Sequence, residues 1–210
     1  MPSRFFVTGT DTGVGKTVVS ALLSAALDAM YWKPIQTGTR EGTDRETVMR
    51  LAQLLESRTI SEAYRFAPPV SPHLAARRAG VRIDLRKIKM PRIPGERNLI
   101  VEGAGGALVP INGAQLMTDL MRRLKLPVLL VSRTALGTIN HTLLSLAALR
   151  AAALDVRGVV MVGKPNAENR KAIEHYGRIR VIGLVPPLSR INRRALLAVF
   201  ARHFDRKAFR

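Results

Sequence analysis

Residues Thr8 to Val18 combine glycines, a lysine and hydroxyl side chains at a spacing that could bind phosphate groups. They read Thr-Gly-Thr-Asp-Thr-Gly-Val-Gly-Lys-Thr-Val and separate a short apolar run from a segment of helical composition. Glycines let backbone N–H groups surround an anion, the helix N-terminus adds positive potential, the lysine reaches the outer phosphates and the threonine hydroxyl binds Mg²⁺. The strict pattern has its first glycine at position 10, whereas here it is Gly9. This stretch predicts a nucleoside triphosphate site made by Gly13, Val14, Gly15, Lys16, Thr17 and Val18.

Charged side chains follow two other apolar runs, where predicted strands end. Lys33 follows Tyr31-Trp32, and Glu102 follows Asn98–Val101. Parallel strands joined by right-handed crossovers end at one edge of a sheet, and ligands bind in the crevice outside that edge. We therefore expect the ammonium groups of Lys16 and Lys33 to face one crevice.

Three oxygen-bearing side chains could bind Mg²⁺ at this edge: Thr17, Asp44 and Glu102. Hard oxygen ligands suit this ion. Asp44 could instead be the N-cap of the helix that begins there, and from the sequence alone this second role is favoured. The glycines after Glu102 would let the backbone approach a phosphate, which predicts nucleotide contacts from Gly103, Ala104 and Gly105.

Two further segments follow predicted strands at the same edge. Leu136–His141 opens a long apolar helix, where Thr138 could be the cap and free N–H groups would make a second anion site. His141 is assigned a structural role, because no partner residue is evident. Pro186, Pro187 and Leu188 follow the last predicted strand and are expected to contact the nucleotide.

Short apolar runs alternate with helix-length segments, a pattern typical of βαβ units and a parallel sheet. Strands are predicted near Arg4–Val7, Tyr31–Ile35, Asn98–Val101, Pro127–Val131, Gly158–Val162 and Val181–Leu184. Helices are predicted near Lys16–Met30, Arg45–Glu56, Pro72–Ala79, Leu116–Leu124, Thr138–Leu154, Glu168–Tyr176 and Asn192–Phe204. The Pro-, Lys- and Arg-rich segment Arg86–Arg97 is predicted as a loop or an irregular helix. We therefore expect an α/β fold of the P-loop NTPase type, with residues 1–210 forming a single doubly wound domain whose mainly parallel sheet is flanked by helices.

Composition restricts the compartment and the chemistry. The 210 residues include no cysteine, which excludes disulfides and a cysteine nucleophile and is consistent with a reducing compartment. No apolar run approaches the length of a membrane span, and the first strand is expected to begin too early for a signal peptide. The sequence thus predicts a cytoplasmic protein.

The charge balance is strongly basic, with 34 Lys and Arg against 15 Asp and Glu and a formal net charge of +19. Such a charge attracts phosphates, nucleic acid and anionic membranes. The basic residues are scattered, with local clusters at Arg86–Arg97, Arg190–Arg194 and Arg202–Arg210, and none alternates with aromatic residues as a nucleic-acid platform would. A solvated arginine-rich face is favoured, so neither a nucleic-acid nor a membrane partner is expected.

An ordered set of motifs resembles the dethiobiotin synthase family over nearly the whole chain. The most specific are Trp-Lys-Pro-Ile-Gln-Thr-Gly (Trp32–Gly38) and Val-Glu-Gly-Ala-Gly-Gly (Val101–Gly106). They occur with Phe6–Thr12, Val14–Thr17, Ser71–His73 and Leu136–His141.

The resemblance implies that 7,8-diaminononanoate reacts with CO₂ to a carbamate, which ATP phosphorylates before the second amine closes the ureido ring. Lys33 would be the catalytic lysine and Lys16 would act from the nucleotide side. By resemblance, Thr17, Asp44 and Glu102 are metal and nucleotide residues. A homodimer with active sites at its interface is implied, because the Gly137–Asn140 turn would come from the neighbouring subunit. Substrate contacts are expected from Thr12, Thr37, Gly137, Thr138 and Asn140.

Two departures from relatives concern the nucleotide. Gly13 replaces a glutamate that some relatives carry, and Val162-Gly163 aligns with an adenine-reading Asn-Asp pair. The base preference is therefore open.

Two other classes compete with this interpretation. A partition-type ATPase that binds a membrane or the nucleoid would fit the basic C-terminal helix, where Leu196, Phe200 and Phe204 share one face. Such ATPases carry an extra lysine early in the phosphate loop, and none lies between Gly9 and Gly15. A cobalamin-pathway amidoligase would need a cysteine-dependent glutaminase domain, for which the chain has neither the cysteine nor the length.

Overall fold

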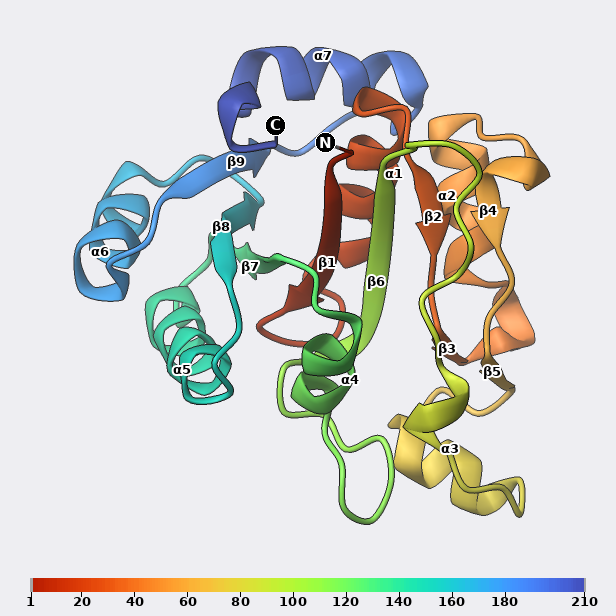
Figure 1. Cartoon of the computed structure of the whole chain (residues 1–210). Helices are drawn as coiled ribbons and strands as arrows, with labels where there is room; N and C mark the ends of the chain where they lie inside the picture. The colour runs from red at the N-terminus through yellow and green to blue at the C-terminus, as the bar shows by residue number, and fades with distance from the viewer. Residues whose placement is uncertain (1, 210) are drawn as a thin grey trace.

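The computed structural model describes residues 2–209, so Met1 and Arg210 of the predicted domain lie outside the described residues. A seven-stranded sheet, ordered β4-β2-β6-β1-β7-β8-β9, forms the centre of the molecule (Figure 1). Every strand pair in it is parallel, which confirms the predicted sheet class. The strands are β1 (Arg4–Gly9), β2 (Met30–Trp32), β4 (Thr59–Ile60), β6 (Leu99–Gly106), β7 (Val128–Arg133), β8 (Val156–Val162) and β9 (Val181–Val185).

Helices cover both faces of this sheet (Figure 1). The face packed against α1, α2 and α7 buries Phe5, Tyr31 and Ile100, whereas the opposite face buries Phe6 and Val101 against α4, α5 and α6. Successive strand residues point to opposite faces, which explains this alternation. The helices are α1 (Lys16–Ala26), α2 (Asp44–Ala52), α3 (Pro72–Arg78), α4 (Met117–Leu124), α5 (Thr138–Ala151), α6 (Ala167–Gly177) and α7 (Arg193–His203).

The predicted strand over Tyr31–Ile35 is wrong, because it is two strands in two different sheets. β2 ends at Trp32, and β3 (Ile35–Thr37) pairs in parallel with β5 (Tyr64–Phe66) in a separate two-stranded sheet. Pro34 lies between them and has no N–H to donate to a strand ladder, which favours the break. Its carbonyl instead accepts hydrogen bonds from Ala63 N at 2.9 Å and Tyr64 N at 3.0 Å. β4 and β5 were not predicted, because strands of two and three residues are too short to show a clear periodicity.

Other boundaries also differ from the prediction. β6 continues through the glycines to Gly106 instead of ending before Glu102. The helices α1 and α2 end earlier, at Ala26 and Ala52. The basic segment is a loop whose only regular element is a single 3₁₀ turn over Leu85–Lys87, as one of the two alternatives predicted. Among residues 2–209, no helix has the length and apolar character needed to cross a membrane.

Candidate active site

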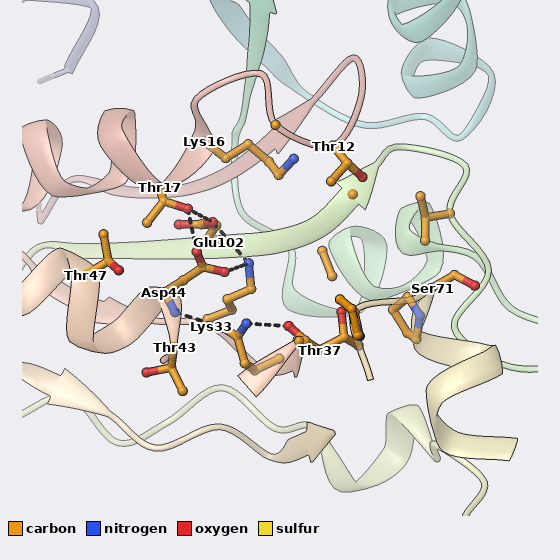
Figure 2. Close-up of a pocket in the computed structure, with 18 of the residues that line it drawn as sticks. Thr12, Lys16, Thr17, Lys33, Thr37, Thr43, Asp44, Thr47, Ser71 and Glu102 are labelled. Carbon is orange, nitrogen blue, oxygen red and sulfur yellow. Dashed lines mark hydrogen bonds and ion pairs between the residues drawn. The ribbon is translucent and has the colours of Figure 1, made fainter. Parts of the chain in front are cut away.

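A cavity of about 660 Å³ lies at the carboxyl ends of β1 and β2, beside β6, and extends to the two-stranded sheet and α3 (Figure 2). The phosphate loop, β2 and β6 bring Lys16, Lys33 and Glu102 to its wall. The predicted site residues that line it are Thr12, Gly13, Gly15, Lys16, Thr17, Val18, Lys33, Thr37, Asp44, Glu102, Ala104 and Gly105. The strand order thus brings together residues that are up to about 90 positions apart in the sequence.

The phosphate loop has a backbone that favours glycine at two positions. Gly13 has φ +70° and Gly15 has φ +99°, both in the left-handed region. A Cβ at Gly15 would also lie 3.0 Å from Cγ1 of Val162, so this turn is pressed against the end of β8. The aligned base-reading position is therefore a packing contact with the loop in this chain.

Lys16 begins α1 directly after Gly15, and its Nζ donates a hydrogen bond of 2.8 Å to the Asp11 carbonyl. Its side chain is buried among the other charges of the site. Burial lowers the pKa of the Lys16 ammonium to about 8; attraction by Glu102 opposes this shift, and repulsion by Lys33 adds to it. Lys16 therefore titrates within reach of physiological pH.

Lys33 lies at the centre of a buried charge cluster (Figure 2). Its Nζ is 2.6 Å from Asp44 Oδ2 and 3.1 Å from Glu102 Oε1, and it also contacts the Gly103 carbonyl at 3.4 Å. Burial disfavours the charged form, but the attraction of Glu102 and then Asp44 outweighs it and raises the pKa of Lys33. Lys33 is thus a fixed cation at the cavity wall.

Thr17 connects the two carboxylates of the cluster. Its Oγ1 lies 2.8 Å from Asp44 Oδ1 and 2.9 Å from Glu102 Oε1. The three side chains predicted as metal ligands therefore converge at one point. Although burial opposes it, the Lys33 charge holds the pKa of Asp44 below its usual value, with help from hydrogen bonds to Lys33 and Thr17.

Glu102 is fully buried, and its second oxygen faces β2. The Tyr31 hydroxyl donates a hydrogen bond of 3.0 Å to Glu102 Oε2. Burial, followed by the nearby Glu102 carboxylate, raises the pKa of Tyr31 well above its usual value, so the hydroxyl keeps its proton. Tyr31 was not among the predicted site residues.

The prediction that Asp44 caps its helix is wrong. Thr43 is the N-cap of α2: its side chain accepts from Glu46 N, while the Glu46 side chain accepts from Thr43 N. This capping box leaves the first helical residue, Asp44, free to point at Lys33. The Asp44 N–H donates to Gln36 Oε1 at 3.2 Å, which ties α2 to β3.

Several predicted site residues do not line this cavity. Val14 and Thr138 line a separate cavity of about 100 Å³ on the other side of the phosphate loop, together with His141, for which a structural role was predicted. Thr138 is not a cap: Gly137 is the N-cap residue of α5, and the Thr138 hydroxyl donates to the Arg133 carbonyl at 2.5 Å. His141 is exposed, so it does not fill a core position. Gly137, Asn140, Pro186, Pro187 and Leu188 line neither cavity.

Gly103 has a packing role behind the cavity wall. A Cβ at this position would lie 2.9 Å from Phe6 Cε1, so the missing side chain makes room for the core of the opposite face. Gly105, in contrast, has φ +68° and lines the cavity, so the predicted backbone contact with a phosphate stays a prediction for this glycine.

The wall opposite the phosphate loop was largely missed. It comes from β3, the turn before α2, and the segment that enters α3. Two of the ordered motifs, Trp32–Gly38 and Ser71–His73, contain residues of this wall, but only Thr37 was predicted as a site residue. The lining residues missed are Gln36, Gly38, Glu41, Gly42, Thr43, Thr47, Pro69, Val70, Ser71, Pro72 and Val109.

The donor set is compatible with Mg²⁺. Residues 2–209 contain no group of three or more His, Cys, Asp or Glu side chains that could hold a metal ion. Two carboxylates with one hydroxyl are a hard-oxygen set of the kind that binds Mg²⁺ together with substrate phosphates. Thr17, Asp44 and Glu102 meet this description, beside a loop suited to phosphates.

Comparisons with known proteins agree with this geometry. A family model described as an AAA domain matches residues 3–195. The ATP-dependent dethiobiotin synthetase BioD of Rhodopseudomonas palustris strain HaA2 is 48% identical over 209 residues, covering 100% of this chain and 97% of that protein. The protein of the same name from Agrobacterium fabrum is 48% identical over 205 residues, covering 98% and 96%.

Solved structures support the fold at much lower identity. The MinD cell division protein of Aquifex aeolicus superposes with a TM-score of 0.53 at 14% identity, covering 95% of each chain. The MinC:MinD complex of that organism gives 0.54 at 15% identity, covering 92% of this chain and 86% of the other. These similarities confirm the P-loop NTPase fold and nothing finer. The sequence identities over the full length go further: the chain belongs to the family of ATP-dependent dethiobiotin synthetases.

Proposed function

We propose that the chain catalyses the ATP- and Mg²⁺-dependent conversion of 7,8-diaminononanoate and CO₂ to dethiobiotin. The observation that carries the proposal is the convergence of Lys16, Lys33, Thr17, Asp44 and Glu102 at one cavity. The reaction forms a carbamate, then a carbamic–phosphoric anhydride, and then the ureido ring with release of phosphate. The phosphorylation step gathers negative charge on the oxygen that bridges the carbamate and the transferred phosphoryl group, and fixed cations stabilise that charge.

The two lysines divide the work in this proposal. Lys33 holds the carbamate and the transferring phosphoryl group, for which its raised pKa keeps it charged. Lys16 neutralises the outer phosphates from the nucleotide side. Thr12 and Thr37 contact the substrate from the walls that they line. In this arrangement the phosphoryl group passes from ATP to the carbamate in the space that lies between the two ammonium groups.

Thr17, Asp44 and Glu102 would hold the Mg²⁺ ion. When bound, the ion supplies positive charge to the phosphate oxygens. The chain's own contribution is the alignment of three oxygens, which Tyr31, Lys33 and the start of α2 fix in place.

The proposed assembly is a homodimer in which the Gly137–Asn140 turn of a second copy completes the substrate site. Gly137 and Leu136 are exposed at the start of α5, and Leu136 has no cover at all within its own chain among the described residues. Lys33→Ala and Asn140→Asp, each weakly active alone, would test this. Mixing them restores activity only if a site takes one residue from each copy.

The decisive experiment measures phosphate release with Mg²⁺-ATP and bicarbonate, with and without 7,8-diaminononanoate, and identifies dethiobiotin by mass. Strict dependence on the diamine and a ureido product are expected. Brisk hydrolysis without the diamine, and no product, would reject the ligase and favour the partition-type ATPase. Co-sedimentation with liposomes or DNA at physiological salt would then test that alternative, which also bears on the predicted cytoplasmic location and the predicted lack of such partners.

A further inference from the structure

We propose that Tyr31 is a positioning residue for the reaction, because its hydroxyl fixes the Glu102 carboxylate so that Oε1 faces Thr17 and Lys33. This inference rests on the proposed function and adds a residue that no phosphate-loop or strand-end pattern includes. Tyr31 does not line the cavity, and its hydroxyl is joined to the site by the hydrogen bond to Glu102.

The sheet register places Tyr31 beside Glu102. In the parallel pair of β2 and β6, Tyr31 is opposite Ile100 and Trp32 is opposite Val101. Glu102 is two residues beyond Ile100, so its side chain lies on the same sheet face as Tyr31. Helix α1, which begins with Lys16 and Thr17, covers this face. The Tyr31 hydroxyl therefore contacts the Glu102 carboxylate from β2, while Thr17 and Lys33 contact it from the cavity side.

Burial makes the hydrogen bond between Tyr31 and Glu102 energetically important. Tyr31 and Glu102 are both fully buried, and among residues 2–209 Glu102 is the one hydrogen-bond partner of the tyrosine hydroxyl. A buried hydroxyl is costly unless it is hydrogen-bonded. A phenylalanine would fill nearly the same volume in this apolar cluster, so the hydroxyl is explained by the carboxylate and not by packing.

The two oxygens of Glu102 have separate partners as a result. Oε2 accepts from Tyr31, while Oε1 lies 2.9 Å from Thr17 Oγ1 and 3.1 Å from Lys33 Nζ. The terminal torsion of glutamate is broad and does not hold the carboxylate by itself. Without the tyrosine hydroxyl, the buried Oε2 loses its partner and only the contacts of Oε1 with Thr17 and Lys33 orient the carboxylate, so its position is less well defined.

The test compares Tyr31→Phe with Tyr64→Phe, a matched loss of a tyrosine hydroxyl outside the cavity. The Tyr64 hydroxyl accepts from Asp84 N at 3.0 Å and lines neither cavity. Binding of Mn²⁺ to the protein with ADP is measured by electron paramagnetic resonance, and kcat and KM for Mg²⁺-ATP are measured separately. We expect Tyr31→Phe to weaken Mn²⁺ binding roughly 10-fold and to raise KM, because partners of metal ligands have effects of this size. Tyr64→Phe should match the wild type in both.

A double variant shows whether Tyr31 acts through Glu102. In a Glu102→Gln background, Tyr31→Phe should add little to the loss of Mn²⁺ binding, because the group that it positions is already changed. Wild-type Mn²⁺ binding in folded Tyr31→Phe, or a full additional loss in the Glu102→Gln background, would overturn the inference. Thermal unfolding verifies that each variant is folded. Failure of the proposed function would appear differently, as wild-type protein that forms no dethiobiotin, and leaves the Mn²⁺ comparison intact.

Discussion

Lys33 and Asp44 form the shortest ion pair of the candidate site, with Nζ 2.6 Å from Oδ2, although their residues come from different elements of the fold. Lys33 follows β2 in the central sheet, and Asp44 is the first residue of α2. Glu102 of β6 is the second carboxylate on the same ammonium, at 3.1 Å. The Lys33 ammonium group, at the end of β2, thus joins helix α2 through Asp44 and strand β6 through Glu102.

The stabilisation from this cluster should depend on pH. The pKa of Asp44 is lowered from an ordinary 3.8 and that of Lys33 is raised from 10.5. The Asp44 contribution is therefore present above pH 3.8 and is lost as pH falls through its lower folded pKa, while the Lys33 contribution is complete below pH 10.5 and is lost at still higher pH. Lys33→Met should lower the free energy of unfolding by about 3 kcal/mol at pH 7 and by less at pH 3. Urea unfolding at both pH values measures the difference, and an equal loss at both would contradict it.

Lys33→Ala should separate turnover from nucleotide binding. In the proposed mechanism Lys33 faces the transferring group, whereas the phosphate loop binds the nucleotide. We therefore expect kcat to fall by at least about 100-fold while the dissociation constant for ATP, measured without Mg²⁺, changes little. Lys33→Arg should rescue only in part, since a planar guanidinium places its donors differently. Steady-state kinetics and calorimetric ATP binding check this, and near-wild-type kcat in Lys33→Ala would remove Lys33 from the mechanism.

ATP binding should take up a proton near pH 8. The pKa of Lys16 is about 8 in the free protein, so its charge is lost as pH rises through that value, whereas bound phosphates favour the charged form. Affinity should be constant near pH 7 and fall above pH 8 by up to about tenfold per pH unit. Calorimetry in two buffers of different ionisation enthalpy measures the uptake. In the control Lys16→Arg the guanidinium stays charged, and persistence of the same uptake there would assign it to another group.

Thr43→Ala should weaken the site as well as the fold. It removes the N-cap that fixes the start of α2 and should cost about 1 kcal/mol of stability. It should also weaken metal and nucleotide binding, because Asp44 is the next residue. Asn192→Ala removes the side-chain cap of α7, where Asn192 accepts from Ala195 N, outside the cavity. Asn192→Ala should lose about as much stability as Thr43→Ala while its metal and nucleotide binding stay unchanged. If the two variants bind metal and nucleotide equally well, the cap does not position Asp44.

Gly15→Ala should damage nucleotide binding for two separable reasons. Its left-handed φ strains any other residue by about 1 kcal/mol, and the new Cβ would press on Val162. Gly80→Ala is the matched control, because Gly80 has φ +65° but nothing within 4 Å of an added Cβ. Both should lose similar stability from strain, while Gly15→Ala alone loses ATP affinity, by about 10-fold or more. Adding Val162→Ala to Gly15→Ala should recover part of that affinity, and an unchanged defect would exclude the contact as a cause.

The central sheet and the cation cluster could be predicted because each depends on local patterns. The phosphate loop has its own spacing, and Lys33 and Glu102 follow apolar runs whose carboxyl ends must share one edge. The N-cap of α2 also has a local signal, since Glu46 follows Thr43 at the capping-box spacing. Asp44 was nevertheless favoured as the cap. Tyr31 could not be found in this way, because its role depends on the register of β2 against β6. The wall from β3 and α3 depends on a second sheet of three-residue strands, which leave no readable period.

The two-sheet division at Pro34 has a consequence for how this protein tolerates change. Lys33 and Pro34 form the junction between the two sheets, which we call the seam. β2 of the central sheet precedes it, and β3, which carries Thr37, follows it. The carbonyl of Pro34 is held by the backbone of Ala63 and Tyr64, some thirty residues further along the chain. A substitution that moves the backbone of Ala63 and Tyr64, unlike the loss of the Tyr64 hydroxyl alone, is therefore expected to displace the Lys33 ammonium group as well. Such variants will resemble active-site mutants in their kinetics while their sequence changes look like ordinary changes in packing.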